Sequence, residues 1–325
     1  MTMSRGAPDN ALFTLRKRPA GEKLLDQAFR QATLALAGVV ALVLFGIFIT
    51  LVKGAQEAIT HFGLEFLATS SWDPVNERYG AFVAIYGTLV TSLVSLLIAV
   101  PLGVGTAIFI TEDLIPVRIR DLIGLMVELL AAIPSVVLGL WAIFVMEPAI
   151  RPFLEGLHKL LGWIPLFSTS PMGPGMAPAI LILVVMVLPI ITAIARDALR
   201  QVPIELRQGA YGVGTTRWGA IFSVILPAAI SSIIGGVMLA LGRAMGETMA
   251  VTFVIGNAHK LSVSLFSPGN SIASTLANEF GEAEPGLHYA SLFALGLALF
   301  VITLVVLTLA KWMLNRAEAK SGLKT

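Results

Sequence analysis

The chain of 325 residues contains no cysteine, and only 13% of its residues are charged. Without cysteine there is no disulfide framework, no thiolate nucleophile and no cysteine-based metal site. The low charge stands against 56% hydrophobic residues, which is too apolar a composition for a soluble domain of this length. The sequence therefore predicts an integral membrane protein.

Sequence patterns of several enzyme classes are missing as well. The dipeptide Gly-Lys does not occur, so the chain lacks the phosphate-binding loop of P-loop ATPases. All four histidines fall in outer segments or at the ends of apolar runs, which argues against a Ser-His hydrolase within the membrane. Asp113 and Asp121 are too sparse for the clustered acidic ligands of a magnesium-dependent lipid-phosphate enzyme. We therefore expect no catalytic site, no metal and no cofactor.

Long apolar runs are abundant, and a membrane-crossing helix requires about 20 such residues. Pro101 and Pro134 are expected kink sites within these runs. The runs predict an all-α membrane protein with one six-helix transmembrane domain over residues 31–315, between a segment 1–30 and a tail 316–325. The six predicted spans are roughly 31–52, 80–111, 119–146, 178–195, 228–256 and 289–313.

The distribution of lysine and arginine predicts the orientation. If the N-terminus is cytoplasmic, sixteen of these cations lie in inner segments and five in outer ones, as the positive-inside rule requires. We therefore expect both termini in the cytoplasm, and the net charge of +2 gives no support to nucleic-acid binding. Residues 11–30 mix apolar and basic side chains, which fits an interfacial helix or a solvated tail equally well.

A polar segment between two of the apolar runs, residues 197–227, has its own physical pattern. Pro203 suits the first turn of a helix, Glu205 is favourable near its positive end, and a short helix over 204–213 would end at Gly212 and Gly214. A spanning helix is expected to restart at Leu226-Pro227.

The spacing within this segment carries a resemblance. Gln208-Gly209-Ala210 is followed after three residues by Gly214 and, after nine more, by Val224, one residue and Leu226-Pro227. This resembles the cytoplasmic signature of ATP-binding-cassette importer permeases, in which Glu usually stands at the position of Gln208. The resemblance implies the MetI-like fold of type I importers and a coupling helix that fits a cleft in a separate ATPase subunit.

Three further stretches are similar to the phosphate-specific permeases of that superfamily. They are Ser71-Trp72-Asp73-Pro74, the run from Glu128 to Pro134-Ser135, and the run from Gly242 to Asn257. The resemblance implies import of inorganic phosphate together with a second related permease, two ATPase subunits and a periplasmic or lipid-anchored phosphate-binding protein that docks on the outer segments. Sulfate, molybdate or tungstate is the alternative cargo, and an ATP-independent ion-coupled carrier is the more distant alternative.

Arg243 is the residue expected to meet the anion. Counted from Pro227 it lies about 24 Å along a helix, near mid-membrane, where an unpaired arginine costs at least about 3 kcal/mol. Its forked donors match two oxygens of an oxyanion. Glu247, four residues on, could neutralise it, and Glu128 and Thr248 complete the predicted pathway. These charges could equally form a static ion pair or gate between helices.

The pattern Gly242-x-x-x-Gly246 on the same run is a close-packing motif of membrane helices. It predicts contact of this helix with its counterpart in the second permease.

Overall fold

The computed structural model describes residues 20–112 and 114–321. Within them every regular element is a helix, and the single β-bridge joins Asp73 to Arg78. The chain divides into two units, residues 1–50 and 51–325.

The first unit consists of most of α1 (Ala20–Gly54), whose membrane-spanning part begins at Leu25. No residue of its apolar window is buried by other parts of the chain, as expected of a helix that lipid or another subunit surrounds. Much of the predicted interfacial segment, residues 11–19, lies outside the described residues. From Ala20 onward the chain belongs to the same helix as the span.

The second unit contains the remaining helices, and two of its long helices include π-helical turns at residues 142–146 and 221–225. In chain order the α-helices are α2 (Gln56–Phe62), α3 (Glu65–Ala68), α4 (Phe82–Thr111), α5 (Val117–Ala132), α6 (Ser135–Trp141), α7 (Glu147–Leu161), α8 (Met176–Arg200), α9 (Ile204–Gly212), α10 (Arg217–Ala220), α11 (Leu226–Gly246), α12 (Met249–Val254), α13 (Ile272–Glu279) and α14 (Leu287–Ser321).

Six helices of the described chain are long and apolar enough to cross a membrane, which agrees with the predicted number. The third span was predicted as one helix over residues 119–146, and the structure differs. The helix is interrupted between α5 and α6, and the membrane-spanning helix runs from Ser135 to Leu161 instead. Pro134 explains the interruption, because proline forces the preceding residue out of the helical region and Ile133 is extended, with ψ of 128°. Pro101 lies inside the continuous α4.

The fifth predicted span is also wrong in its boundaries. Its helix begins at Arg217, where the Thr216 hydroxyl accepts a hydrogen bond from the Gly219 N–H, and it passes through Leu226-Pro227 without a restart. It ends at Gly246, and α12 follows as a separate short helix. Counting helix length from Pro227 therefore does not fix the depth of Arg243, whose surroundings place it instead.

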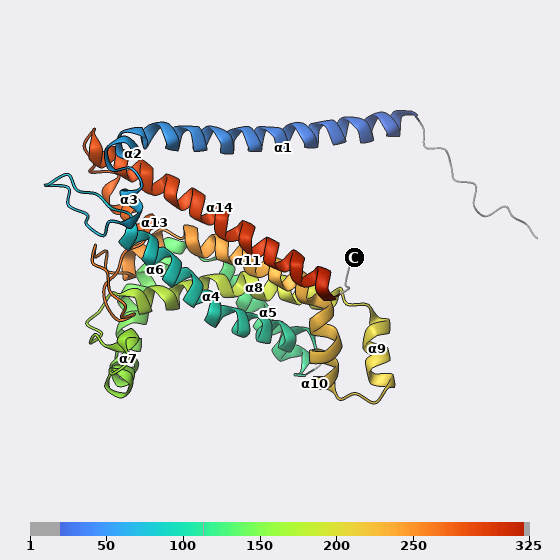
Figure 1. Ribbon diagram of the computed structural model, residues 1–325. Coiled ribbons are helices and arrows are strands. Elements are labelled where there is room, and N and C mark those ends of the chain that lie inside the picture. The colour runs from blue at the N-terminus through green and yellow to red at the C-terminus, as the bar shows by residue number, and fades with distance from the viewer. Residues whose placement is uncertain (1–19, 113, 322–325) are drawn as a thin grey trace, which may run out of the picture. The chain divides into compact units, whose positions relative to one another are not determined.

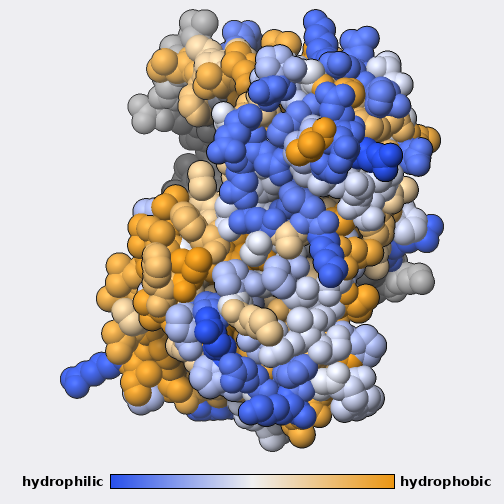
Figure 2. Space-filling model, turned by 90° about the vertical axis from the view of Figure 1, so that its left-hand side faces the viewer, coloured by the Kyte–Doolittle hydropathy of each residue, from blue (hydrophilic) through white to orange (hydrophobic). Residues whose placement is uncertain are grey.

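The second unit has two distinct ends (Figure 1). We call the end with α9, α10 and the C-terminal part of α14 the α9 end, and the opposite end, with α2, α3, α7 and α13, the loop end. Figure 2 looks onto the loop end, where hydrophilic residues cover much of the face.

Close approaches of backbone hold the bundle together. A Cβ on Gly103 of α4 would lie 2.8 Å from the Ile191 side chain of α8, so these two central helices pack as closely as glycine permits. At the loop end, a Cβ on Gly87 would overlap the Asn270 carbonyl, and the Thr88 hydroxyl accepts a hydrogen bond of 2.9 Å from the Ile272 N–H. The chain before α13 is thereby attached to α4.

Candidate transport site

Arg243 lies in the last turn of α11 and lines a cavity of about 180 Å³. The other lining residues are apolar and come from α5, α6, α8 and the interruption between α5 and α6. They are Leu130, Ala131, Ile133, Leu138, Met186 and Ile190. Arg243 is thus the only charged side chain among the residues that line this cavity, and its side chain is 48% exposed.

Two interrupted helices meet beside this cavity. The break between α5 and α6 forms part of the cavity wall. The break between α11 and α12 begins at Glu247, four positions after Arg243. α6 packs on α12, because a Cβ on Gly139 would lie 2.9 Å from the Ala250 Cα and 2.6 Å from the Phe253 ring. Irregular backbone at membrane depth is tolerated only where protein or a water-filled cavity satisfies its polar groups. The break between α5 and α6 lies where such a cavity can satisfy its polar groups.

Glu247 occupies the second break and has two contacts. One carboxylate oxygen lies 3.8 Å from Arg243 Nη2, and the other accepts a hydrogen bond of 3.4 Å from the Ala250 N–H in the first turn of α12. The Glu247 side chain is only 7% exposed. The predicted Arg243–Glu247 pair is therefore present, although Glu247 lies just beyond the helix that carries Arg243. The Thr248 hydroxyl donates to the Gly246 carbonyl at 3.2 Å.

Glu128 has a different partner from the one expected. Its carboxylate accepts a hydrogen bond of 3.0 Å from Arg196 Nη1 of α8, and the Glu128 side chain is 61% exposed. Arg196 also lies 3.3 Å from Asp197. The structure therefore links α5 to α8 through Arg196, a residue that sequence reasoning counted only toward orientation.

The signature segment forms the short helix expected of it. α9 covers residues 204–212, close to the predicted 204–213, and Gly214 has a φ of +82°, a left-handed conformation that favours glycine. Gln208, Gly209 and Gly214 are exposed, whereas Ala210 is buried. Farther on, Leu226 and Pro227 lie inside the helix that leads to α11.

An ion pair between Arg207 and Glu112 at the α9 end was not predicted from the sequence. Arg207 Nη1 donates to Glu112 Oε1 at 2.6 Å, and Arg207 Nη2 donates to the Leu199 carbonyl at 2.6 Å. The two charged side chains are only 16% and 10% exposed. No sequence pattern joins residues 95 positions apart, but a glutamate at the end of an apolar run and an arginine beside the signature were both visible.

A polar cluster was likewise missed at the loop end. The Glu279 carboxylate accepts hydrogen bonds from Trp72 Nε1 at 2.7 Å and pairs with His259 Nε2 and His288 Nε2 at 3.0 Å each. The Trp72 and His259 rings stack, with centroids 5.4 Å apart. Burial raises the pKa of Glu279, but the hydrogen bonds from the two histidines and the tryptophan outweigh it and lower that pKa below its ordinary value. This cluster gives Trp72 of the Ser71–Pro74 stretch a structural role.

Comparisons with known proteins agree with this geometry. Residues 99–318 match the family model described as "Binding-protein-dependent transport system inner membrane component". The chain therefore belongs to this family of membrane components of binding-protein-dependent transport systems.

Curated relatives narrow the family to one kind of permease. Proteins named "Phosphate transport system permease protein PstC" from Mesorhizobium japonicum and Pasteurella multocida are 48% and 45% identical. The alignments cover 92% and 93% of this chain and 93% and 95% of those proteins. A "Probable phosphate transport system permease protein PstC" from Methanocaldococcus jannaschii is 35% identical over 81% of this chain and 85% of its own length.

Solved structures confirm the predicted fold of type I importer permeases. One is the crystal structure of a bacterial alginate ABC transporter in complex with an alginate pentasaccharide-bound periplasmic protein, matched with a TM-score of 0.58 at 19% identity over 91% of this chain and 97% of that one. A second alginate importer structure matches with a TM-score of 0.55 at 20% identity, over 90% of this chain and 99% of that one. At this identity the likeness concerns the fold alone.

Proposed function

We propose that this chain is the membrane permease subunit of an ATP-driven importer of inorganic phosphate, which works by alternating access. The observation that carries the proposal is Arg243 at an apolar cavity between two interrupted helices, with a buried carboxylate 3.8 Å away. The curated relatives, all phosphate transport permeases by name, supply the cargo.

The α9 end faces the cytoplasm in this proposal, and the loop end faces outward. Both termini are then cytoplasmic, in keeping with the sixteen-to-five distribution of cations. Two ATPase subunits similar to PstB would contact α9 and hydrolyse ATP, since this chain lacks a phosphate-binding loop. A PstA-like permease would complete the pathway, and a PstS-like phosphate-binding protein would dock at the loop end.

Arg243 would bind phosphate through its fork of donors, because a guanidinium pairs with two oxygens at once. When the pathway is empty, Glu247 neutralises Arg243. An entering anion competes with Glu247 for the guanidinium, so the carboxylate weakens anion binding and favours release. Thr248 directly follows Glu247 and offers a hydroxyl near the same break.

Arg196 and Glu128 would act as the inner part of the pathway. Arg196 lies six residues beyond Ile190 of the cavity wall, about 9 Å farther along α8 toward the α9 end. Its pairing with Glu128 joins α5 to α8 there. We assign this pair to a gate that closes the inner side when the site at Arg243 is open to the outside.

Uptake of labelled phosphate into proteoliposomes tests the function. The vesicles hold this chain with its co-purifying partners and binding protein, with and without internal ATP, and unlabelled sulfate or molybdate is added as competitor. ATP-dependent uptake that survives both competitors is expected. Blockage by either competitor would reassign the cargo, and uptake without ATP would contradict an ATP-driven importer.

Arg243→Ala tests the anion site in the same vesicles. Loss of uptake is expected while the partners still co-purify, because the cavity then has no charge for the anion. Arg118→Ala is the control, since Arg118 is exposed at the start of α5, away from the cavity. Normal phosphate uptake by the Arg243 variant would contradict the assignment.

A further inference from the structure

The Arg207 guanidinium joins three separate parts of the chain at the α9 end. Arg207 belongs to α9, Glu112 directly follows α4, and Leu199 is the next-to-last residue of α8. Both contacts measure 2.6 Å, and the two charged side chains are nearly buried. We call Arg207, the Glu112 carboxylate and the Leu199 carbonyl the Arg207 latch.

The position of the latch suits a cation. The last carbonyls of a helix lack partners within the helix, and they carry the negative end of its dipole. The ends of α4 and α8 come together here, so one guanidinium contacts both the Leu199 carbonyl at the end of α8 and the Glu112 carboxylate that follows α4. A forked side chain can make both contacts at once, whereas a lysine presents a single point of charge.

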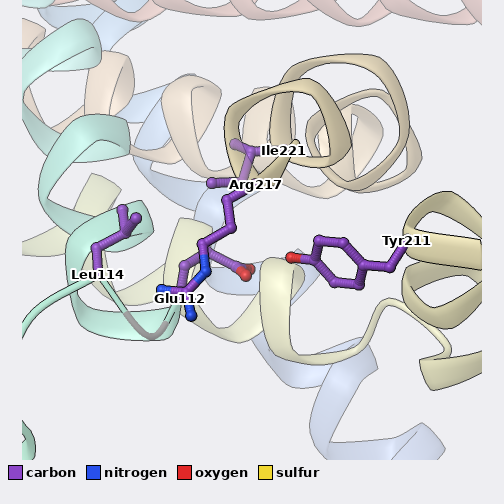
Figure 3. A pocket seen from close by; sticks show the side chains of 5 residues that line it. All are labelled: Glu112, Leu114, Tyr211, Arg217 and Ile221. Carbon is purple, nitrogen blue, oxygen red and sulfur yellow. The ribbon is translucent and has the colours of Figure 1, made fainter. Parts of the chain in front are cut away.

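Apart from the latch, α9 has mostly exposed side chains. Ala210 is the one buried residue of α9, and Ile204, Leu206 and Tyr211 are all exposed. Beside the latch lies a cavity of about 350 Å³ lined by Glu112, Leu114, Tyr211, Arg217 and Ile221 (Figure 3). Figure 3 shows the Tyr211 hydroxyl pointing from α9 into this space. The side of α9 that faces α10 is therefore not tightly packed.

The latch connects α9 to the wall of the transport site. α8 carries Leu199 at its latched end and, farther back, Met186 and Ile190 of the Arg243 cavity. α4 packs tightly against α8, since there is no room for a side chain at Gly103. A displacement of α9 is thus applied through Arg207 to the ends of both central helices.

We propose that the Arg207 latch is the connection through which α9 drives α4 and α8, which makes Arg207 and Glu112 positioning residues for transport. The inference rests on the proposed function only in taking α9 as the segment that the ATPases move. It predicts that an importer without the latch still binds its ATPases and hydrolyses ATP but moves little phosphate.

Two double variants separate the ion pair from simple folding effects. Arg207→Gln with Glu112→Gln removes both charges and leaves no buried charge unpaired, and Arg207→Glu with Glu112→Arg restores a pair with the charges exchanged. In proteoliposomes of the full importer, the neutral variant is expected to lower phosphate uptake per ATP hydrolysed at least about tenfold, and the exchanged variant to recover much of that loss. Arg118→Gln is the control for loss of an arginine at the same end.

A second measurement does not depend on phosphate. Because the chain has no cysteine, two introduced cysteines are its sole sites for spin labels. The substitutions are Val213→Cys beyond α9 and Phe109→Cys on α4, both at exposed positions. We expect a narrow distance distribution in the otherwise unchanged importer, a broad one in the neutral variant, and a narrow one again in the exchanged variant.

The outcomes separate the two proposals. Unchanged coupling and an unchanged distance distribution in the neutral variant would overturn the latch and leave phosphate import standing. So would an exchanged variant that is no better than the neutral one in both measurements. If the unmodified importer takes up no phosphate but the distances broaden and narrow as expected, the latch stands and the proposed cargo falls.

Discussion

At the scale of single residues, the Glu247 carboxylate makes two different contacts. One oxygen lies near the Arg243 guanidinium, and the other accepts from the Ala250 N–H at the start of α12. Glutamine in its place keeps an acceptor for Ala250 and removes the charge that competes with the anion. The two contacts can therefore be separated by a single substitution.

Glu247→Gln should bind phosphate more tightly at the transport site and release it more slowly. We expect an up to several-fold lower KM for phosphate and a lower maximal rate in proteoliposomes, because an ion pair with a half-exposed arginine at 3.8 Å is worth roughly 0.2–1 kcal/mol. Glu155→Gln, at an exposed position on α7, is the matched control. A raised KM with an unchanged maximal rate would show that Glu247 does not compete with the anion.

Sequence reasoning at this scale predicted the pairing of Arg243 with Glu247, because an arginine within an apolar run is costly unless it has a partner. It failed for Arg196, Arg207 and Glu112. Their partners lie 68 and 95 positions away, and only the packing of α4, α5, α8 and α9 brings them together.

At the scale of the helices, two interruptions differ in whether the sequence predicts them. The break at Pro134 follows from covalent geometry and was predicted as a kink. The break at Glu247–Thr248 contains no proline. There the Glu247 carboxylate accepts from the Ala250 N–H and α12 packs on α6, and neither contact is visible in a hydropathy profile. The early start at Arg217 has a readable signal in the Thr216 cap, but the Leu226-Pro227 pair obscured it.

Gly139→Ala should destabilise the contact between α6 and α12. The new Cβ would lie 2.9 Å from the Ala250 Cα, and such overpacking costs about 1–3 kcal/mol. Gly105→Ala is the matched control, because a Cβ at Gly105 of α4 meets nothing within 4 Å and alanine favours a helix by up to about 1 kcal/mol. Thermal unfolding of the purified chain in detergent should show a lower Tm for Gly139→Ala and an equal or higher one for Gly105→Ala; equal Tm values for both variants would refute tight packing at this crossing.

On the scale of the whole molecule, the Glu279 cluster unites distant segments of the loop end. Trp72 comes from the chain before α4, His259 from the segment after α12, and His288 from the first turn of α14. Such contacts lie 207, 20 and 9 positions away from Glu279. The six spans and a short helix close to residues 204–213 were predicted from the sequence, but this convergence was not.

The lowered pKa of Glu279 makes the loop end sensitive to acid. A carboxylate whose folded-state pKa is lowered adds stability that is fully present above its unfolded pKa of about 4.3 and is lost as the pH falls through the lower folded value. Glu279→Gln should therefore lower the Tm at pH 7, and its difference from the unmodified chain should shrink when both are measured near pH 3. Glu282→Gln, an exposed neighbour, should change neither; a difference that persists at low pH would show that the Glu279 charge is not responsible.

The Glu279 cluster also bears on how the protein is made. Its parts leave the ribosome in the order Trp72, His259, Glu279 and His288, and His288 opens the last helix, α14. Chains are synthesised from the N-terminus. More than two hundred further residues must therefore be synthesised before Trp72 can donate its hydrogen bond to Glu279. The loop end can acquire its final form only after α14 is in place, and a nascent permease arrested before α14 would present an incompletely assembled face.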